Sequence, residues 1–364
     1  MKLIYRYIFF ELITPLLFGI AAFTGIFVGT DLLFRLIDYY NRYPVDILTL
    51  AQLFFLNLPA IIVITFPMAT LLGTIMAFGR LSGDSEITAL RAGGISILRI
   101  IMPALMIGLA MTFITIGVNE YVVPRANYMD QEIVWELRNF QKKPVTQNNL
   151  LLPSKDSRGR PDFFLYTSVF NGETGRMENI IFQDFENGEP FQLIEAEEAV
   201  WSDDGWQFLN GRIIHLKAGE RIPSITFNEY RVNLDYNPSQ VSQLNKNIDD
   251  MSFAELREFI ELQQRQGKNV NRELVKLHQR LAIPFANFIF ALLAAVLGIQ
   301  PQRSGGSATG MGISIGVIFI YYTIMTVGSA MGEQGTISPF LGAWIQNIIF
   351  LLVGGIMLYR VNRG

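Results

Sequence analysis

The sequence ILTLAQLFFLNLPAIIVITFPMATLLGTIMAFG, residues 47–79, contains no Asp, Glu, Lys or Arg. A helix needs about 20 mostly apolar residues to cross the hydrocarbon core of a bilayer, where it satisfies its own backbone hydrogen bonds. This run is longer than one perpendicular crossing requires, and it contains Pro59 and Pro67. It therefore predicts a membrane-spanning helix that is tilted or kinked.

Five further charge-free runs predict spans of the same kind. They are residues 12–30, 100–119, 281–302, 304–332 and 334–359. Of the 29 basic and 32 acidic residues, only 14 lie in 1–124 and only 4 in 281–364, so the middle of the chain is the water-soluble part. The predicted fold class is an α-helical membrane protein with six transmembrane helices, three plus three, and an inserted external domain.

The positions of Lys and Arg predict the orientation, because positive charge in short loops stays on the cytoplasmic side. The basic residues that flank the spans on one side are Lys2, Arg6, Arg80, Arg91, Arg99, Arg303, Arg360 and Arg363. The short loops on the other side, 38–46 and the turn at Glu333, contain Arg42 alone. We therefore expect a multi-pass membrane protein with both termini in the cytoplasm and the insert outside.

The insert is predicted to be an all-β module followed by a short helix. Strands are expected at 163–170, 180–185, 191–200, 206–209 and 212–216, with hairpin turns at Asn171-Gly172, Asn187-Gly188 and Asn210-Gly211. Ser252 and Glu255 form a capping box that predicts a helix over about 252–266. The strand pattern leaves sandwich, barrel and jelly roll open. The expected domains are 1–124, 125–270 and 271–364.

The sequence contains no motif for catalysis. It has no cysteine, no phosphate-binding loop, no HExxH and no GxSxG. His215 and His278 have no partners at metal-ligand spacing, so we interpret both as structural and expect no metal or cofactor in this chain. A net charge of −3 with scattered basic residues argues against a nucleic-acid partner. We expect that the chain is not an enzyme.

The loop GRLSGDSEITALRAGGIS, residues 79–96, predicts a short helix between the second and third spans. Asp84 or Ser85 can cap its start, and Glu86 falls in the first turn, where the helix dipole favours an anion. Gly93-Gly94 is a typical helix end.

Apolar side chains on this short helix form a stripe that we expect to be exposed. Ile87 and Leu90, with Ala89 beside them, make the stripe, and Glu86 and Arg91 flank it. Two interpretations are open. The segment is either a connector that lies on the membrane surface, or a helix that inserts into a groove of a cytoplasmic partner.

Several short stretches along the whole chain carry a family resemblance. They are Arg6-Tyr7, Phe66-Pro67-Met68-Ala69 with Leu71-Leu72-Gly73, Ser85-Glu86 with Leu90-Arg91-Ala92-Gly93-Gly94, and Glu273-Leu274 with Arg280 and Pro284. With an external all-β domain, these features resemble the LptF/LptG (YjgP/YjgQ) family of lipopolysaccharide export permeases. The resemblance implies the transmembrane subunit of an ABC transporter in the bacterial inner membrane, which extracts lipopolysaccharide or a similar lipid.

The resemblance also implies partners. A separate ATPase resembling LptB would bind ATP and Mg and contact a coupling helix at about 84–94. The residues assigned to this coupling are Asp84, Glu86, Ile87, Leu90 and Arg91. A second LptF/LptG-type chain, a paralogue or a copy of this one, would complete the permease. The external domain would be jelly-roll-like and would pass lipid toward periplasmic proteins of the LptC and LptA kind.

Charged residues near the outer end of the first span are candidates for contact with the substrate. Members of the resembled family often carry Lys or Arg in the outer half of this span, where they meet phosphorylated sugar. This chain instead has Asp31, followed by Arg35 and Arg42. Arg35 is the best candidate for an anionic head group, and the alternative is an anchor at the membrane interface.

Glycines four residues apart mark two spans where helices can approach closely. They are Gly25 and Gly29 in the first span and Gly312 and Gly316 in the fifth. Packing within the chain would explain them, whereas the resemblance implies that these spans form the seam between two permease chains.

Two other functional classes stay open on the residues alone. A secondary transporter would need acids or bases that relay protons, and the span centres contain amides such as Asn57 and Asn287 instead. A membrane assembly scaffold without a transport role is the other alternative.

Overall fold

The computed structural model divides into two compact units, which we describe separately. One contains Met1–Phe140 and Asn271–Gly364, and the other contains Gln141–Val270. The residues that the structure describes are 2–139, 146–155, 160–171, 174–186, 188–202, 205–217, 220–221, 225–232, 238, 241, 248–265, 268–299 and 307–363.

The first unit is helical. Its elements are α1 (Lys2–Phe27), the π-helical turn η1 (Val28–Leu32), α2 (Leu33–Arg42), α3 (Ile47–Gly83), α4 (Glu86–Ala92), α5 (Ile97–Tyr121), α6 (Val123–Asn139), α9 (Asn271–Ile299), α10 (Ser307–Glu333) and α11 (Pro339–Arg363). Six stretches in the described residues are long and apolar enough to span a membrane, which confirms the predicted three-plus-three arrangement. The predicted start of the fifth span, residues 304–306, and the predicted end of the fourth, residues 300–302, lie outside the described residues.

The helices extend beyond the apolar runs. α1 begins at Lys2 rather than at residue 12, and α9 begins at Asn271 rather than at 281. Backbone hydrogen bonding continues through polar flanks, so hydropathy marks the part of a helix in lipid and not its ends. α3 remains one helix through Pro59 and Pro67, and the carboxylate of Asp46 caps its start by accepting from the Thr49 amide at 3.3 Å.

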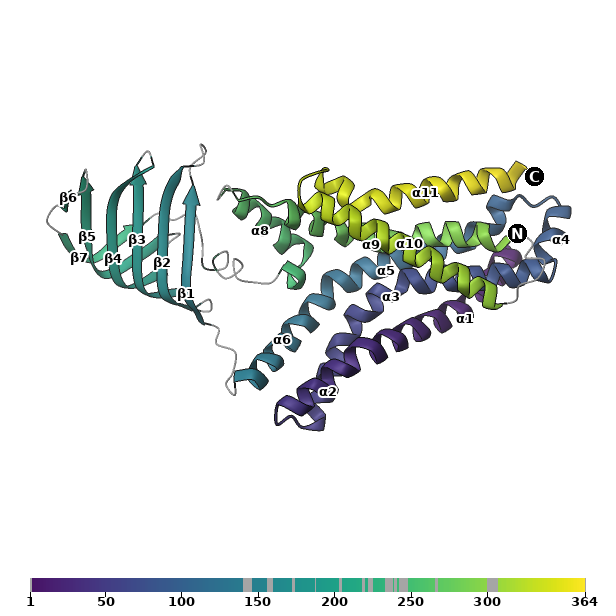
Figure 1. Cartoon of the computed structure of the whole chain (residues 1–364), viewed down its shortest axis with the longest axis horizontal. Helices are drawn as coiled ribbons and strands as arrows, with labels where there is room; N and C mark the ends of the chain where they lie inside the picture. Colours follow the sequence, from purple (N-terminus) through teal and green to yellow (C-terminus); the bar gives the residue numbers. More distant parts are fainter. Residues whose placement is uncertain are drawn as a thin grey trace. The chain divides into compact units, whose positions relative to one another are not determined.

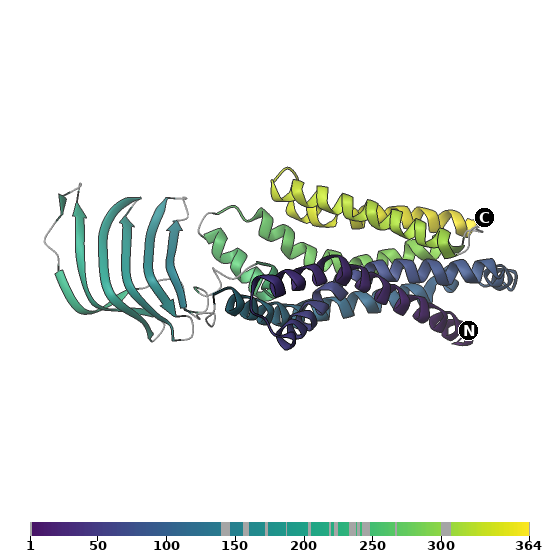
Figure 2. The ribbon, with the colours of Figure 1, turned by 60° about the horizontal axis from the view of Figure 1, so that its bottom comes forward.

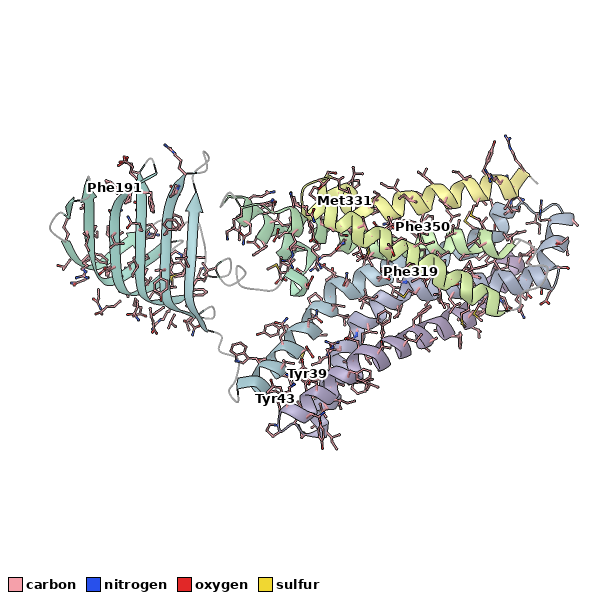
Figure 3. All side chains as sticks on the ribbon, viewed as in Figure 1. Tyr39, Tyr43, Phe191, Phe319, Met331 and Phe350 are labelled. Carbon is pink, nitrogen blue, oxygen red and sulfur yellow. The ribbon has the colours of Figure 1, made fainter. Side chains whose placement is uncertain are left out.

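Both ends of the helical unit's chain lie at the same end of the bundle. α1 starts and α11 finishes there, and α4 lies beside them (Figures 1 and 2). Tyr39 and Tyr43, at the far end of α2, lie away from α4 (Figure 3). Interfacial tyrosines are typical of the ends of spans. The helices therefore alternate in direction as the predicted topology requires.

α9 is the central helix of the bundle: 78% of the residues in its most apolar stretch are buried, compared with 17% in the corresponding stretch of the first span. It packs on α3, α5 and α11. Its buried Asn287 accepts from the Thr70 hydroxyl of α3 at 3.0 Å and donates to the Thr115 hydroxyl of α5 at 3.1 Å and to the Pro284 carbonyl at 2.9 Å. These bonds join three helices where lipid offers no alternative partner.

The helical unit extends past residue 124, where we expected the domain boundary. α6 follows α5 directly and packs back on α3. Ile133, Val134 and Leu137 of α6 contact an apolar cluster around Leu53. Asn57 of α3 donates to the Asp130 carboxylate at 2.7 Å. These contacts, which link residues far apart in sequence, assign α6 to the helices.

The second unit contains an antiparallel sheet and α8. Its elements are β1 (Thr146–Lys155), β2 (Pro161–Asn171), β3 (Arg176–Glu186), β4 (Glu189–Ser202), β5 (Gly205–Lys217), β6 (Glu220–Arg221), β7 (Ile225–Val232), the 3-10 turn η2 (Ile248–Asp250) and α8 (Phe253–Arg265). The strands are ordered β1-β2-β3-β4-β5-β6, and β7 pairs with β5. The expected all-β module is confirmed, and its described strands form a curved meander (Figure 1).

One predicted hairpin turn is wrong. Asn210 and Gly211 lie inside the continuous strand β5, with Asn210 at φ +50°. Gly211 is needed for packing, because an added Cβ would lie 2.3 Å from the Glu195 carbonyl oxygen and 2.4 Å from the Phe227 ring. The turn after Asn171 is present, since its carbonyl accepts from the Gly175 amide at 2.9 Å. Gly172 and Asn187 lie outside the described residues.

The capping box at the start of α8 is present in both directions. The Ser252 amide donates to the Glu255 carboxylate at 2.7 Å, and the Glu255 amide donates to the Ser252 hydroxyl at 3.2 Å. Leu262 of α8 joins the apolar core of the sheet. Gly267, expected to stop the helix, lies outside the described residues.

Gly73 allows α1 and α3 to pack closely, because an added Cβ would lie 2.8 Å from backbone atoms of Leu16. We predict that Gly73→Ala destabilises the helical unit by about 1–3 kcal/mol through overpacking. Thermal unfolding of the full chain in detergent should show a lower midpoint. Gly79→Ala is the matched control on the same helix, since no described atom lies within 4 Å of its added Cβ. Equal midpoints for the two variants would contradict this packing role.

Candidate functional site

The predicted short helix is present as α4, and its caps differ in part from expectation. Ser85 occupies the N-cap position in a left-handed conformation, with φ +60°, and its side chain makes no capping hydrogen bond. Of the two residues expected as possible caps, Asp84 or Ser85, the Ser85 alternative is therefore not realised, because a residue that caps through its side chain normally has an extended rather than a left-handed backbone. The end is as expected: Gly94 has φ +80°, and the Ile95 amide donates to the Leu90 carbonyl at 3.1 Å.

The predicted exposed apolar stripe on α4 is wrong. Ile87 is only 3% exposed and belongs to the core of the helical unit, and Leu90 packs against the same core. A helix of seven residues is marginal in water, so these two side chains anchor α4 to the bundle. The exposed face consists instead of Thr88, Ala89, Arg91 and Ala92, with Asp84 just before the helix.

The two charged residues of α4 have different surroundings. Glu86 is half-buried and accepts a hydrogen bond from the Tyr7 hydroxyl of α1 at 3.1 Å. Arg91 is exposed, and among the described residues its guanidinium has no ion-pair or hydrogen-bond partner. Arg91 is therefore available to a partner molecule, whereas Glu86 is already held from within the chain.

A second polar contact lies beside the first and was missed by the sequence reasoning. Glu11 of α1 forms an ion pair with Arg80 in the last turn of α3. The only local signal is the i, i+4 spacing of Tyr7 and Glu11, which places both on one side of α1. Sequence spacing says nothing about which helix faces that side.

The candidate substrate-contacting residues form two short-range ion pairs. Arg35 pairs with Asp31 at 2.9 Å, and Arg42 pairs with Asp38 at 2.7 Å. All four side chains are about half exposed or more. Each arginine thus has an acid one turn earlier, so these two ion pairs leave no unbalanced positive charge between residues 31 and 42.

The four glycines that we expected at a seam are not covered by other described residues. Gly25, Gly29, Gly312 and Gly316 are exposed, and no described atom lies within 4 Å of a Cβ added at any of them. Packing within the chain therefore does not explain them among the described residues. Two exposed faces, one on α1 with η1 and one on α10, are left where another helix can approach closely.

Neither histidine takes part in a metal cluster in the part of the chain that the structure describes. His215 packs edge-on against Phe191 with ring centroids 5.8 Å apart, and His278 packs against Phe340 at 5.5 Å. These contacts fit the interpretation of both as structural aromatic residues.

Comparison with known proteins gives matches over nearly the whole chain. Residues 6–360 match the family "Lipopolysaccharide export system permease LptF/LptG". The chain is 23% identical to the lipopolysaccharide export system permease protein LptG of Escherichia coli (strain K12), with 96% of this chain and 95% of that protein covered. LptF of the same strain is 22% identical over 81% of this chain and 78% of its own. LptG of Haemophilus influenzae is 21% identical over 82% of each.

The anchoring role of Ile87 can be tested by hydrogen exchange. We predict that Ile87→Ala releases α4, because truncating a buried isoleucine costs about 2–5 kcal/mol. Amides of residues 86–92 in the full chain should then exchange much faster, while those of α9 stay protected. Thr88→Ala, on the exposed face of the same helix, is the matched control and should leave exchange unchanged or slower. Unchanged exchange in Ile87→Ala would show that α4 is held by other contacts.

Proposed function

The chain belongs to the lipopolysaccharide export system permease family LptF/LptG, and from this premise we propose that it is the membrane-spanning permease subunit of a lipid exporter of the inner membrane. The exporter would take lipopolysaccharide, or a related amphiphile, out of that membrane and pass it to a periplasmic bridge. The observation that carries the proposal is a match that runs through both the helical unit and the β unit.

Energy for export is proposed to come from a separate ATPase subunit resembling LptB, which would bind ATP and Mg. α4 is the proposed docking helix for two reasons. Its exposed face has small apolar side chains at Ala89 and Ala92, and it also presents Arg91, which has no ion-pair or hydrogen-bond partner among the described residues. Its anchored face transmits force, since Ile87 and Leu90 are packed into the bundle. Docking of such a helix into a groove is a common mode of recognition.

The proposed orientation places α4 and both termini in the cytoplasm and the β unit in the periplasm. Lys2, Arg6, Arg80, Arg91 and Arg99 gather at the end of the helical unit where α1 starts, which supports this orientation. The β unit would then be the part that meets periplasmic proteins of the LptC and LptA kind.

The permease is proposed to contain two such chains, this one and a paralogue or a second copy. The exposed glycines of α1 and α10 support a seam on these helices, because they leave room for a neighbouring backbone. Together the two chains would enclose the path of the lipid.

The docking role of α4 predicts the effect of a bulky charge on its exposed face. We expect Ala89→Glu to reduce co-purification of the ATPase subunit at least about tenfold, because a central contact of an interface is worth roughly 2 kcal/mol or more. The readout is the amount of ATPase recovered with the tagged permease in mild detergent. Ala254→Glu, at an exposed alanine of α8, is the control and should retain the ATPase. Full recovery of the ATPase with Ala89→Glu would remove α4 as the docking site.

The ion pair in the first span predicts a gain of lipid binding when its acid is removed. Asp31→Asn leaves Arg35 free to meet an anionic head group, and we expect about two- to fivefold tighter binding of purified lipopolysaccharide, the size of an exposed ion pair. The measurement is the dissociation constant of lipopolysaccharide for the wild-type and Asp31→Asn permeases in nanodiscs. Adding Arg35→Gln to Asp31→Asn should abolish the gain. Equal affinity of wild type and Asp31→Asn would exclude Arg35 as a head-group contact.

A further inference from the structure

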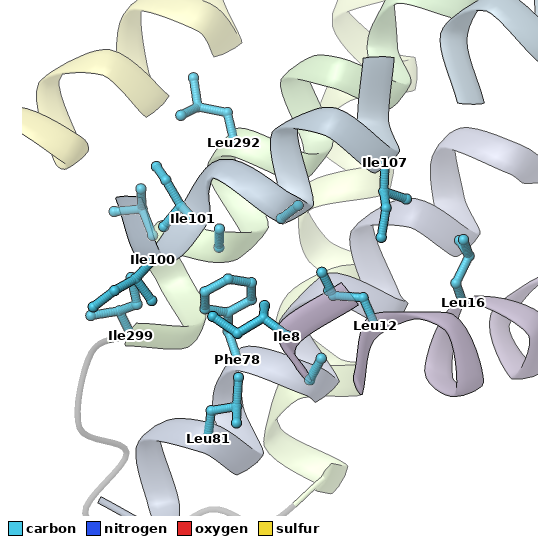
Figure 4. Close-up of a cluster of buried hydrophobic side chains, with 14 of the residues drawn as sticks. Ile8, Leu12, Leu16, Phe78, Leu81, Ile100, Ile101, Ile107, Leu292 and Ile299 are labelled. Atoms are coloured by element: carbon cyan, nitrogen blue, oxygen red, sulfur yellow. The ribbon is translucent and has the colours of Figure 1, made fainter. Parts of the chain in front are cut away.

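The first turns of α1 are part of the same block as α4. Ile8 and Leu12 of α1 are buried with Phe78 and Leu81 of α3, as Figure 4 shows, and Ile87 of α4 belongs to the same apolar cluster. α1 is distant in sequence from the other two segments, whereas the end of α3 and α4 follow each other closely along the chain. If α4 is displaced, the side chains of α1 and of the end of α3 that pack against it must therefore move as well, because packed interiors transmit strain.

Polar contacts border this apolar cluster on one side of α1. The Tyr7 hydroxyl donates to Glu86 of α4 at 3.1 Å, and one turn along the helix Glu11 pairs with Arg80 of α3. Tyr7 and Ile8 are neighbours, so the hydroxyl contact lies directly beside the buried cluster. Glu86 is the first residue of α4, at the border between its anchored and its exposed faces.

The Tyr7 contact crosses from the proposed docking helix to the proposed seam helix. α1 carries Tyr7 near its start and the exposed Gly25 nearer its end. α1 runs as one helix from Lys2 to Phe27, with Pro15 between Tyr7 and Gly25, so a displacement of α4 relayed to Tyr7 acts on the helix that carries the exposed glycine. Arg80, by contrast, ties α1 to α3, and its guanidinium makes no ion pair or hydrogen bond with α4 among the described residues.

We propose that Tyr7 is a positioning residue for energy coupling: its hydroxyl holds the Glu86 carboxylate and ties α4 to the first span. The inference rests on the proposed function, because it names the contact through which a movement of α4, caused by the ATPase, would be passed to the helix that lines the lipid path. The contact is made by the hydroxyl, and the Tyr7 side chain as a whole is 44% exposed. Loss of the hydroxyl alone therefore uncouples the two helices without releasing α4 from the ATPase.

Tyr7→Phe is the appropriate variant, because it keeps the ring and removes only the donor. One partly exposed hydrogen bond contributes little to unfolding free energy, so the variant should fold. Tyr5→Phe is the matched control, since it removes a hydroxyl two residues away for which no hydrogen bond to a described residue is present. Glu86→Ala, which removes the acceptor, alone and combined with Tyr7→Phe, completes a double-mutant cycle.

The first experiment measures coupling in proteoliposomes that contain the complete exporter and purified lipopolysaccharide. For Tyr7→Phe we expect ATPase recovery like that of wild type, and lipopolysaccharide extracted per ATP hydrolysed lower by about fivefold, the scale of one ordinary hydrogen bond. Tyr5→Phe should match wild type. Adding Tyr7→Phe to Glu86→Ala should change nothing more. An unchanged ratio in Tyr7→Phe, or additive effects in the cycle, would overturn the inference.

The second experiment needs neither ATPase nor transport, so it separates this inference from the proposed function. The chain has no cysteine, so spin labels attached at Phe10→Cys on α1 and Thr88→Cys on α4 report on these two helices alone. The distance distribution should be narrow with Tyr7 and broader with Phe at that position. An unchanged distribution would overturn the link. If the wild-type chain recruited no ATPase at all, the proposed function would fail, while this comparison would still decide whether Tyr7 holds α4.

Discussion

Everything in the helical unit follows from the absence of water in the bilayer core. A buried peptide group there must find its partner within the protein, so each crossing segment is a helix. Hydrophobic burial does not distinguish a neighbouring helix from lipid, and close contact has to hold the bundle together. Gly73 supplies such contact by bringing the α1 and α3 backbones together. Asn287 adds hydrogen bonds that specify which helices meet.

The central position of α9 explains how a chain interrupted by a soluble insert makes one bundle. α9 is the first helix after the insert, and it is buried against α3 and α5, which precede the insert. The two parts of the helical unit therefore complete each other's core. α1 and α10 retain exposed faces with glycines, and these are the faces to which we assign the proposed seam.

The docking role that we propose for the short helix α4 depends on its being anchored. A free helix of seven residues would fray, and a push on it would be absorbed locally. Ile87 lies in the core and Glu86 is held by Tyr7, so α4 presents a small, fixed surface. This surface includes Arg91, whose guanidinium has no ion-pair or hydrogen-bond partner among the described residues. The same packing that hides its apolar residues makes it able to transmit a force.

The sequence by itself determined the features that arise from local rules. Charge-free length specified six spans, alternating residues specified an all-β insert, and the Ser252 and Glu255 spacing specified the start of α8, because each depends on neighbours along the chain. Tertiary structure decided which face of α4 is buried, why Gly211 lies within a strand under Phe227, and that Tyr7 meets Glu86. Those facts depend on contacts between distant segments, and periodicity shows that a helix has two faces without showing what lies against either.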